Sequence, residues 1–281
     1  MRAIIFDRQL KFVRNCPRPR RKCDEALVRV LKAGVCNTDL EIIKGYMGFR
    51  GILGHEFVGV VERAARRDWV GQRVAGEINC ACGSCGCCAR GLRTHCPRRS
   101  VLGILNRHGA FADFLTLPLA NLHRVPDSVG DDEAVFVEPL AAAFQILEQV
   151  KIGPSHNVAV LGDGKLGLLA AQVLHLAGAK VTAVGRHSEK LAILERRGIR
   201  VCLRADGGQG YDVVVDCTGL PGGFDLATRL TRPRGTLVLK STAAAHAQLN
   251  LAPLVINEVT LIGSRCGPFP PALAALARKR V

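Results

Sequence analysis

Cysteine is concentrated in one short segment of this sequence. Six of the twelve cysteines lie between residues 80 and 96, in the segment CACGSCGCCARGLRTHC. Four of them follow the pattern C-x2-C-x2-C-x7-C, which lets four thiolates converge tetrahedrally on one zinc ion. They are Cys82, Cys85, Cys88 and Cys96. The pattern predicts a closed structural zinc site. An iron–sulfur cluster stays open as an alternative, as does a shift of the ligand set onto Cys80 or Cys87.

The cellular compartment decides between metal ligands and disulfides. The N-terminal segment MRAIIFDRQLKFVRN is amphipathic and lacks the charged-then-apolar pattern of a secretion signal. No uninterrupted apolar run is long enough to cross a bilayer. A chain of 281 residues can also bury enough apolar surface to fold without disulfides. We therefore expect a cytoplasmic protein with reduced thiols and no membrane partner.

The chain is strongly basic, with a formal net charge of +15. Such a charge can attract nucleic acid or an acidic substrate. Its basic residues are scattered, however, and cluster only in CPRPRRKC at 16–23 and ARKRV at 277–281. No aromatic and basic RNA-binding motif accompanies them. We expect a solvated basic surface and no nucleic-acid partner.

The elements that must position these residues change character near residue 140. Before it, short β-like runs such as AIIFD and FVGVVERA are separated by Gly, Pro and Asn, which predicts a mostly antiparallel domain. After it, apolar strands alternate with helices, beginning with NVAVL and KLGLLAAQVLHLAG. This alternation predicts a parallel sheet covered by helices on both faces. Residues 138–150 are expected to form a helix that joins the halves.

A glycine-rich segment in the second half predicts a nucleotide site. VAVLGDGKLG places Gly162, Gly164 and Gly167 as G-x-G-x-x-G between a strand and a helix. The first glycine permits a tight turn, the second lets the backbone approach a pyrophosphate, and the third allows close helix–strand packing. The N-terminus of the helix then offers unpaired N–H groups to the phosphates.

The end of the next strand bears on the choice of cofactor. An Asp or Glu normally binds the adenosine ribose there, but this chain has Gly185, followed by Arg186 and His187. A missing carboxylate removes repulsion against a 2′-phosphate, which a guanidinium can bind. We expect NADP or NAD as the cofactor, with NADP(H) bound more tightly.

Three further motifs complete an ordered series: GVCNTDLEI at 34–42, GHEFVGVV at 54–61 and VEPLA at 137–141. With the cysteine loop and the glycine motif, they resemble the zinc-dependent medium-chain dehydrogenases of the alcohol dehydrogenase superfamily, in the branch of sorbitol, threonine and glucose dehydrogenases. The resemblance implies an α/β fold with a GroES-like, mostly β catalytic domain at 1–137. A doubly wound Rossmann domain that binds NAD(P) is expected at 138–266, and residues 267–281 would start a C-terminal return segment.

The same resemblance implies a second, catalytic zinc ion. Its ligands would be Cys36 and His55, with Glu56 and Glu138 as the further ligands, and which glutamate binds directly stays open. Thr38 matches the hydroxyl that removes the alcohol proton, and Asp39 is placed to steady the imidazole. Glu41 stands where many relatives have a histidine of the proton relay.

Further residues match positions near the cofactor in that family. Thr218 and Gly219 close the strand DVVVDCTG, and LIGSRCG at 261–267 matches the stretch near the nicotinamide. The expected contacts also include positions in and after the glycine motif, namely Gly162, Gly164, Lys165, Leu166, Gly167, Gly185, Arg186, His187 and Lys190.

The resemblance implies hydride transfer between NAD(P) and an alcohol, a polyol or a sugar-like substrate, by a protein that forms a homo-oligomer, dimer or tetramer. The alternative is a truncated, non-catalytic relative that retains zinc and nucleotide binding, because relatives continue beyond PPALAALARKRV. In that case apolar surface around residues 268–276 should be exposed, and activity should be low.

Overall fold

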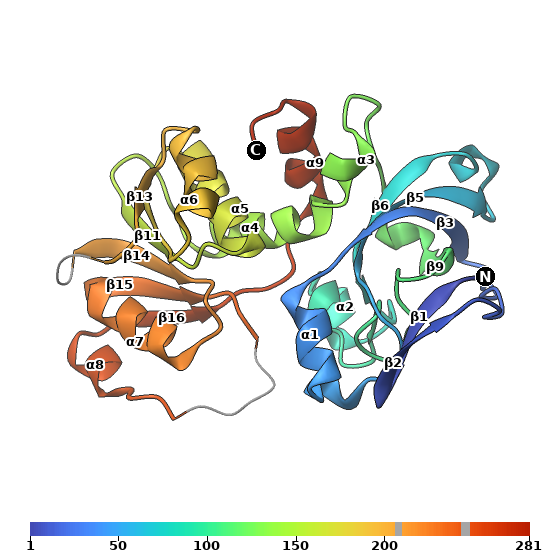
Figure 1. Cartoon of the computed structure of the whole chain (residues 1–281), viewed down its shortest axis with the longest axis horizontal. Helices are drawn as coiled ribbons and strands as arrows, with labels where there is room; N and C mark the ends of the chain where they lie inside the picture. The colour runs from blue at the N-terminus through green and yellow to red at the C-terminus, as the bar shows by residue number, and fades with distance from the viewer. Residues whose placement is uncertain (206–209, 243–247) are drawn as a thin grey trace. The chain divides into compact units, whose positions relative to one another are not determined.

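The computed structural model describes residues 1–205, 210–242 and 248–281. The chain divides into two compact units (Figure 1). Unit 1 comprises Met1–Glu138 and Phe269–Arg278, and unit 2 comprises Pro139–Pro268 and Lys279–Val281. Unit 1 is therefore assembled from two segments that the whole of a parallel sheet separates in the sequence.

Antiparallel pairing dominates unit 1, as its short punctuated strands predict. A five-stranded sheet has the order β10-β6-β5-β3-β9, and a smaller sheet has the order β2-β1-β4. The larger sheet contains β3 (Glu25–Gly34), β5 (Glu56–Arg63), β6 (Arg73–Gly76), β9 (Phe114–Pro118) and β10 (Leu122–Arg124). The smaller sheet contains β1 (Ala3–Asp7), β2 (Gln9–Val13) and β4 (Gly51–Ile52).

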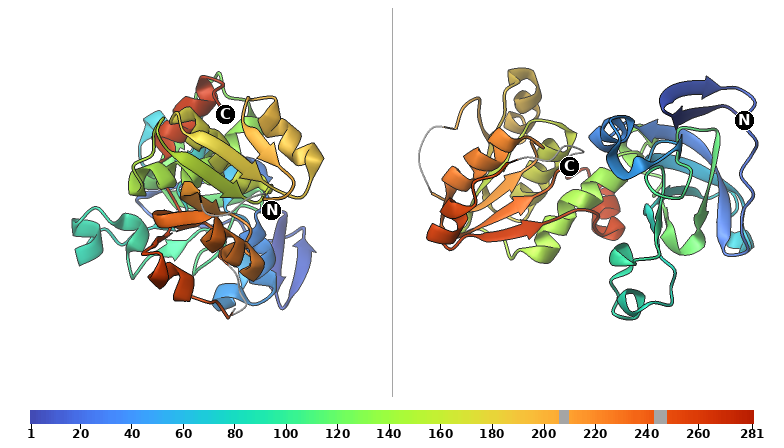
Figure 2. Two further views of the ribbon diagram at one scale, coloured as in Figure 1. Left: turned by 90° about the vertical axis from the view of Figure 1, so that its left-hand side faces the viewer. Right: turned by 90° about the horizontal axis from the view of Figure 1, so that it is seen from below.

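The cysteine-rich segment forms a loop between two short paired strands, β7 (Asn79–Cys80) and β8 (Ser100–Val101). It carries the one-turn helix α2 (Gly86–Ala89) and the 3-10 turn η3 (Arg93–His95). This loop projects from the body of unit 1 (Figure 2). A projecting segment has little core of its own, so its shape must be held by local cross-links.

A short helix directly after β3 was not expected from the sequence. Helix α1 (Asn37–Ile43) has Cys36 as its N-cap residue and buries Ile42 completely beside Phe6, Phe49 and Leu53. This apolar contact fixes the helix against the unit. The other short helices of unit 1 are α3 (Asp131–Ala134), η1 (Tyr46–Gly48), η2 (Arg67–Trp69) and η4 (Leu119–Asn121).

The last helix corrects one expectation. Residues 268–276 were expected to expose apolar surface, but α9 (Phe269–Ala277) buries five apolar residues, namely Phe269, Ala272, Leu273, Ala275 and Leu276. Phe269 also stacks on His123, with ring centroids 5.0 Å apart. The expectation was wrong because α9 returns to unit 1 and covers its apolar face there.

Unit 2 contains one six-stranded sheet in which every pairing is parallel. Its order is β13-β12-β11-β14-β15-β16, so the chain moves outward from β11 first in one direction and then in the other. The strands are β11 (Asn157–Leu161), β12 (Lys180–Val184), β13 (Arg200–Cys202), β14 (Tyr211–Asp216), β15 (Thr231–Leu239) and β16 (Thr260–Gly263). The expected doubly wound α/β fold is confirmed.

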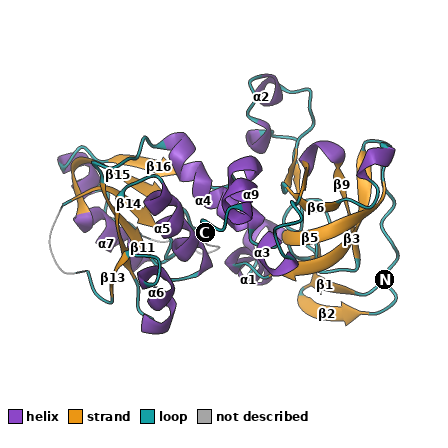
Figure 3. Ribbon diagram, turned by 90° about the horizontal axis from the view of Figure 1, so that it is seen from above, coloured by secondary structure: helices purple, strands orange, loops and turns teal. Residues whose placement is uncertain are grey.

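Right-handed crossovers in opposite directions place helices on opposite faces of such a sheet. Figure 1 accordingly shows α5 (Lys165–Leu176) and α6 (Ser188–Glu195) on one face and α7 (Pro221–Leu230) on the other. Figure 3 shows the helices against the strands they cover. The remaining helices are α4 (Val137–Gln149), which carries the chain from unit 1 into unit 2, and α8 (Ala252–Ile256). In the described ranges no helix is both long and apolar enough to traverse a membrane.

Candidate metal and dinucleotide sites

The four cysteines predicted to bind structural zinc come together in the projecting loop. Their sulfur atoms lie within 4.8 Å of one another. A tetrahedral ion with metal–sulfur bonds of about 2.3 Å requires sulfur–sulfur separations of roughly 3.8 Å. The separations are 3.5 Å for Cys85–Cys88, 3.7 Å for Cys85–Cys96, 3.5 Å for Cys82–Cys96 and 4.0 Å for Cys82–Cys88. The four sulfurs therefore fit one zinc ion.

The two remaining cysteines of the segment lie outside this group. Cys80 is buried in β7, and burial raises the pKa of its thiol to about 11. Cys87 instead accepts a contact from Arg90, whose Nη2 lies 3.8 Å from the sulfur. In a multi-iron cluster the cysteines bind different iron atoms, which keeps their sulfurs farther apart than a shared ion does. The arrangement favours a single ion held by the four cysteines of the predicted spacing.

The loop backbone acidifies one of these thiols. A hydrogen bond from the Ser84 backbone is the main cause that lowers the pKa of Cys82 to about 5. Burial has the opposite effect on Cys88 and raises the pKa of its thiol to about 11. Because zinc binds thiolates, the remaining thiol protons leave when the ion enters.

The pairing of β3 with β5 assembles the second predicted metal site. Gly34 lies opposite Glu56 in this antiparallel pair, so Cys36, just after β3, comes beside His55, just before β5. The ligand atoms of Cys36, His55 and Glu56 lie within 4.8 Å of one another. His55 is 3% exposed and Glu56 is 1% exposed. A half-buried thiol beside a buried imidazole and a buried carboxylate forms a donor set that fits zinc.

Asp39 organises this site from behind. Its Oδ2 accepts a hydrogen bond of 2.9 Å from the Cys36 backbone N–H, and its Oδ1 accepts one of 3.2 Å from the Gly54 N–H. The same Oδ1 lies 3.3 Å from His55 Nδ1. This contact turns Nδ1 towards the carboxylate and leaves Nε2 as the ring nitrogen available to a metal ion.

The charge around the imidazole also suits a cation. Burial alone lowers the pKa of His55, but the contacts with Asp39 and Cys36, together with the charge of Glu138, raise it well above its usual range. Glu138 lies in the first turn of α4 and is not one of the three residues whose ligand atoms converge. The structure thus groups Glu56 with Cys36 and His55, and it places Glu138 near enough to act on the imidazole by its charge.

The two residues expected to handle protons lie on α1. Thr38 Oγ1 is 3.7 Å from Cys36 Sγ, so the hydroxyl lies beside the candidate ligands. Glu41, one helical turn later, is 8% exposed, and its Oε1 accepts a hydrogen bond of 2.9 Å from Lys44 Nζ. Glu41 therefore offers a carboxylate that is already paired with a lysine on the same helix as Thr38.

The glycine motif forms the turn between β11 and α5. Gly162 has a φ of +106°, which permits the tight turn. A Cβ at Gly167 would lie 1.9 Å from the Gly162 carbonyl oxygen, so this glycine is needed where the helix meets the strand. A Cβ at Gly164, which caps α5, would meet nothing within 4 Å. The open side beside Gly164, at the N-terminus of a twelve-residue helix, fits a pyrophosphate.

Beside the carboxyl end of β12 lies a carboxylate that the sequence pattern did not indicate. Asp163, between the first two glycines of the motif, accepts hydrogen bonds at Oδ2 from the backbone N–H groups of Arg186 (2.6 Å) and His187 (2.7 Å). A Cβ at Gly185 would lie 2.5 Å from the Asp163 Cβ. The premise that this edge lacks a carboxylate was wrong, because Asp163 reaches it from the neighbouring strand.

The other predicted cofactor residues lie along the same sheet and its helices. Thr218 follows β14 and donates from its backbone N–H (2.8 Å) and its hydroxyl (2.7 Å) to Asp216 Oδ1. Gly219 has a φ of +68°. Lys165 and Leu166 open α5, and Lys190, in α6, is half-buried.

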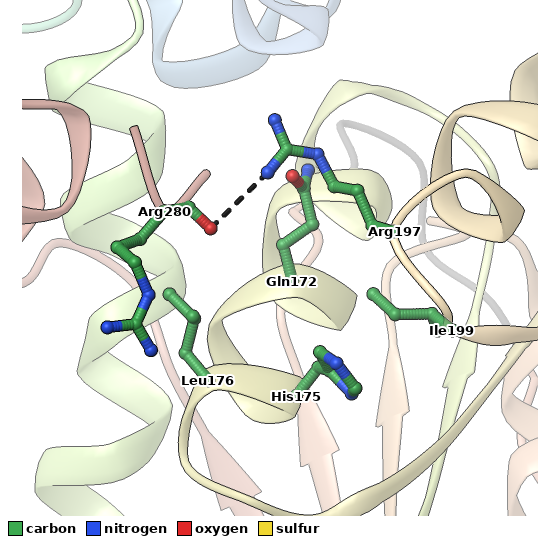
Figure 4. A pocket seen from close by; sticks show the side chains of 6 residues that line it. All are labelled: Gln172, His175, Leu176, Arg197, Ile199 and Arg280. Atoms are coloured by element: carbon green, nitrogen blue, oxygen red, sulfur yellow. Dashed lines mark hydrogen bonds between the residues drawn. The ribbon is translucent and has the colours of Figure 1, made fainter. Parts of the chain in front are cut away.

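A pocket of about 220 Å³ lies elsewhere in unit 2, at the opposite end of α5 (Figure 4). Arg197 Nη1 donates a hydrogen bond of 3.3 Å to the Arg280 carbonyl oxygen across it. None of the residues predicted to bind metal or cofactor lines this pocket, whose walls are Gln172, His175, Leu176, Arg197, Ile199 and Arg280. It is therefore distinct from the glycine turn.

Known protein families match both halves of the chain. Residues 22–127 match the family described as alcohol dehydrogenase GroES-like domain, and residues 166–278 match the family described as zinc-binding dehydrogenase. A D-altritol 5-dehydrogenase of Agrobacterium fabrum is 31% identical over 271 residues, which cover 89% of this chain and 80% of that protein.

Two solved structures share the fold over the whole chain. One, from Sinorhizobium meliloti 1021, is described as a zinc-binding dehydrogenase bound to NADP. It has a TM-score of 0.90 and 28% identity, and the match covers 100% of this chain and 89% of that one. The other, an alcohol dehydrogenase of Escherichia coli CFT073 complexed with NADH, has a TM-score of 0.89 and 25% identity, with 100% and 88% covered.

Proposed function

The chain belongs to the zinc-binding dehydrogenases of the alcohol dehydrogenase family, and from this premise we propose that it oxidises an alcohol or polyol, or reduces the matching carbonyl, with NAD(P) as the hydride carrier. The observation that carries the proposal is the convergence of half-buried Cys36 with buried His55 and Glu56. The same chain contains a glycine turn fitted to a dinucleotide. A metal ligand set and a hydride acceptor site are the two parts that alcohol oxidation requires.

Each residue of the buried site has a proposed part in the reaction. Cys36, His55 and Glu56 would hold the zinc ion, and Glu138, whose charge acts on His55, would be the alternative carboxylate ligand. When bound, zinc supplies a Lewis acid that makes a hydroxyl group more acidic. Asp39 would hold His55 Nδ1 and so keep Nε2 directed towards the zinc ion. Thr38 would take up the hydroxyl proton of the substrate as it releases its own hydroxyl proton to water, and the Glu41–Lys44 pair lies next on the same helix.

A second zinc ion is proposed for the projecting loop, which gives two ions per chain. All four ligands there are thiolates, so the ion is fully coordinated and has no position for substrate. Its role would be to hold α2 and η3 in place. The two ions would therefore differ in function as well as in ligands.

Zinc analysis and a dehydrogenase assay test the proposal together. The purified protein should contain two zinc ions per chain and should reduce NAD⁺ or NADP⁺ in the presence of a panel of polyols and simple alcohols. Removing the metal with a chelator should abolish turnover, and added zinc should restore it. Zinc and nucleotide binding without turnover of any alcohol or carbonyl in the panel would favour the non-catalytic alternative.

Self-association and location complete the proposal. Strand β16 is the last strand of the sheet order, and the nearby Val255 and Ile256 are 77% and 78% exposed. An outer strand, together with exposed apolar side chains in the helix before it, favours pairing with a second copy, so we propose a homo-oligomer, which light scattering would detect. All twelve cysteines lie in the described ranges and none is paired in a disulfide, which supports a reducing, cytoplasmic location.

A further inference from the structure

We propose that Asp163 binds the adenosine ribose of the dinucleotide and biases this protein towards NAD(H) over NADP(H). The inference rests on the proposed dehydrogenase function and concerns the cofactor that this function uses. It assigns the choice between the two dinucleotides to a residue inside the glycine motif. The sequence pattern would instead place that residue at position 185, after β12.

The first step is the location of the carboxylate. Strands β11 and β12 are parallel neighbours with Leu161 paired to Val184, so Asp163 and Gly185 follow the two strands at one sheet edge. In folds with this glycine motif, an acidic residue about 20 positions further on hydrogen-bonds the ribose 2′-hydroxyl. Gly185 stands at that position, and a Cβ there would lie 2.6 Å from Asp163 Oδ2. The Asp163 side chain therefore occupies the space into which a side chain at position 185 would extend, and it brings a carboxylate to this place.

The second step is how firmly the carboxylate is held. Besides the two backbone N–H donors, His187 Nδ1 lies 3.0 Å from Oδ2 and 3.1 Å from Oδ1. Burial alone would raise the pKa of Asp163, but the N–H groups of His187 and Arg186 lower it overall, so the group is ionised at neutral pH. Its side chain remains 11% exposed, and both backbone N–H groups bond to Oδ2, so Oδ1 can still accept a hydrogen bond from a ligand.

The third step is discrimination between the two dinucleotides. A ribose 2′-hydroxyl can donate a hydrogen bond to an ionised carboxylate, whereas a 2′-phosphate cannot donate and is repelled. The backbone N–H groups of Arg186 and His187 could otherwise bind a phosphate, but Asp163 already uses them.

Arg186 favours NADP(H) over NAD(H), because its guanidinium could bind a 2′-phosphate. Its side chain is exposed, however, so solvent and salt screen its charge. A buried carboxylate with three donors is fixed in place and less screened, so we expect its effect to dominate.

Equilibrium titration tests the inference without an activity measurement. NADH and NADPH, and the fragments 5′-AMP and adenosine 2′,5′-bisphosphate, are titrated into the holoenzyme at one salt concentration. We expect the form without the 2′-phosphate to bind roughly tenfold more tightly or better, since hydrogen bonds to charged groups reach this size. Asp163→Asn should reduce the ratio of affinities by a similar factor.

Asp212→Asn is the matched control. Asp212 is a carboxylate of the same unit, and it accepts hydrogen bonds from a backbone N–H (Asn157, 2.8 Å) and a side chain (Arg232 Nε, 2.7 Å). It lies at the start of β14, so it is at the amino ends of the strands and not at the carboxyl ends. Its loss should leave the affinity ratio unchanged. An equal change in both variants would contradict a specific role for Asp163.

Exchanging the residues at positions 163 and 185 provides a second test if Asp163→Asn folds poorly. The double variant Asp163→Gly with Gly185→Asp returns the carboxylate to the end of β12 without the clash, and it should restore the preference for NADH. A parent protein that binds both dinucleotides equally, or NADPH more tightly, would overturn the inference and assign the site to Arg186. Binding of neither dinucleotide would instead contradict the proposed dehydrogenase function.

Discussion

The two candidate metal centres of unit 1 differ in how the chain builds them. The four-cysteine centre draws every ligand from one projecting loop, and Cys82 in it is exposed. The centre at Cys36 draws its ligands from two strands that pair across the sheet, and His55 and Glu56 are almost fully buried. The first centre can hold only its own loop together, whereas the second depends on the whole unit for its geometry.

This difference separates stability from chemistry. A site closed by four thiolates leaves a metal ion no free position, so its loss should act on the fold. A site with three converging donors, whose imidazole also contacts a carboxylate, leaves the metal ion a position for a further ligand. Loss of that ion should therefore reduce turnover. Substitutions at the two centres should therefore change different measurements.

The largest effect on turnover is expected for Cys36→Ser. Removing the thiolate from the buried set should lower kcat/KM by roughly 100-fold or more, because the loss of even an outer partner costs 10- to 100-fold. Steady-state kinetics and the melting temperature are measured on the same preparation, and the melting temperature should change little. Cys87→Ser is the control, since that thiol lies outside both ligand sets. Comparable losses in both variants would remove the distinction between the centres.

Asp39→Asn should have the next largest effect. The amide cannot accept from the Cys36 and Gly54 N–H groups and also orient the imidazole as a carboxylate does. We expect activity and zinc affinity of this centre to fall by about 10- to 100-fold. Asp132→Asn removes an exposed carboxylate paired with Lys32 and serves as the control. Unchanged zinc affinity in Asp39→Asn would show that Asp39 does not support the metal site.

A single methyl group should distinguish the two centres. At Gly34 an added Cβ would lie 2.5 Å from Glu56 Oε2, so Gly34→Ala should displace the carboxylate and reduce activity by roughly tenfold. At Gly86, in the cysteine loop, an added Cβ would meet nothing within 4 Å. Gly86→Ala should therefore be silent in kinetics and in zinc content. Full activity in Gly34→Ala would argue against Glu56 as a ligand.

The smallest effect on turnover, but the largest on stability, is expected for Cys85→Ser. The variant should contain one zinc ion less per chain and should melt at least about 5 °C lower, since 1 kcal/mol corresponds to about 2–4 °C for domains of this size. Below the transition its kcat should stay within about threefold of the parent value, because the buried donors are intact. A melting temperature equal to that of the parent would mean that the loop needs no metal.

The sequence predicts the local features of this molecule well. The four cysteines are close in the chain, so their spacing predicts which sulfurs converge. The structure is needed to place Cys80 and Cys87 outside the group. The glycine motif is similarly local, because each of its glycines has a steric role within one turn. Alternating strands and helices predict the parallel sheet, since its strands are apolar on both faces.

Features that depend on packing between distant residues could not be predicted in this way. Asp163 reads as an arbitrary residue between two glycines, and only the juxtaposition of β11 and β12 shows that it reaches Gly185. The burial of α9 was missed because its apolar surface is covered by residues near His123, far away in the sequence. The N-terminal segment reads as strand-like throughout, but its division into β1 and the almost entirely exposed β2 becomes apparent only in the structure.

The return of α9 to unit 1 has a consequence for synthesis of the protein. Unit 1 begins at Met1 but includes Phe269–Arg278, so the ribosome must add the 130 residues of Pro139–Pro268 before this last piece exists. At about 5–20 residues per second, that interval lasts on the order of ten seconds. During it, the surface that Phe269 and Leu273 later cover is accessible to chaperones and to other nascent chains. The parallel sheet can meanwhile fold from a continuous segment, so the part of the protein made first is completed last.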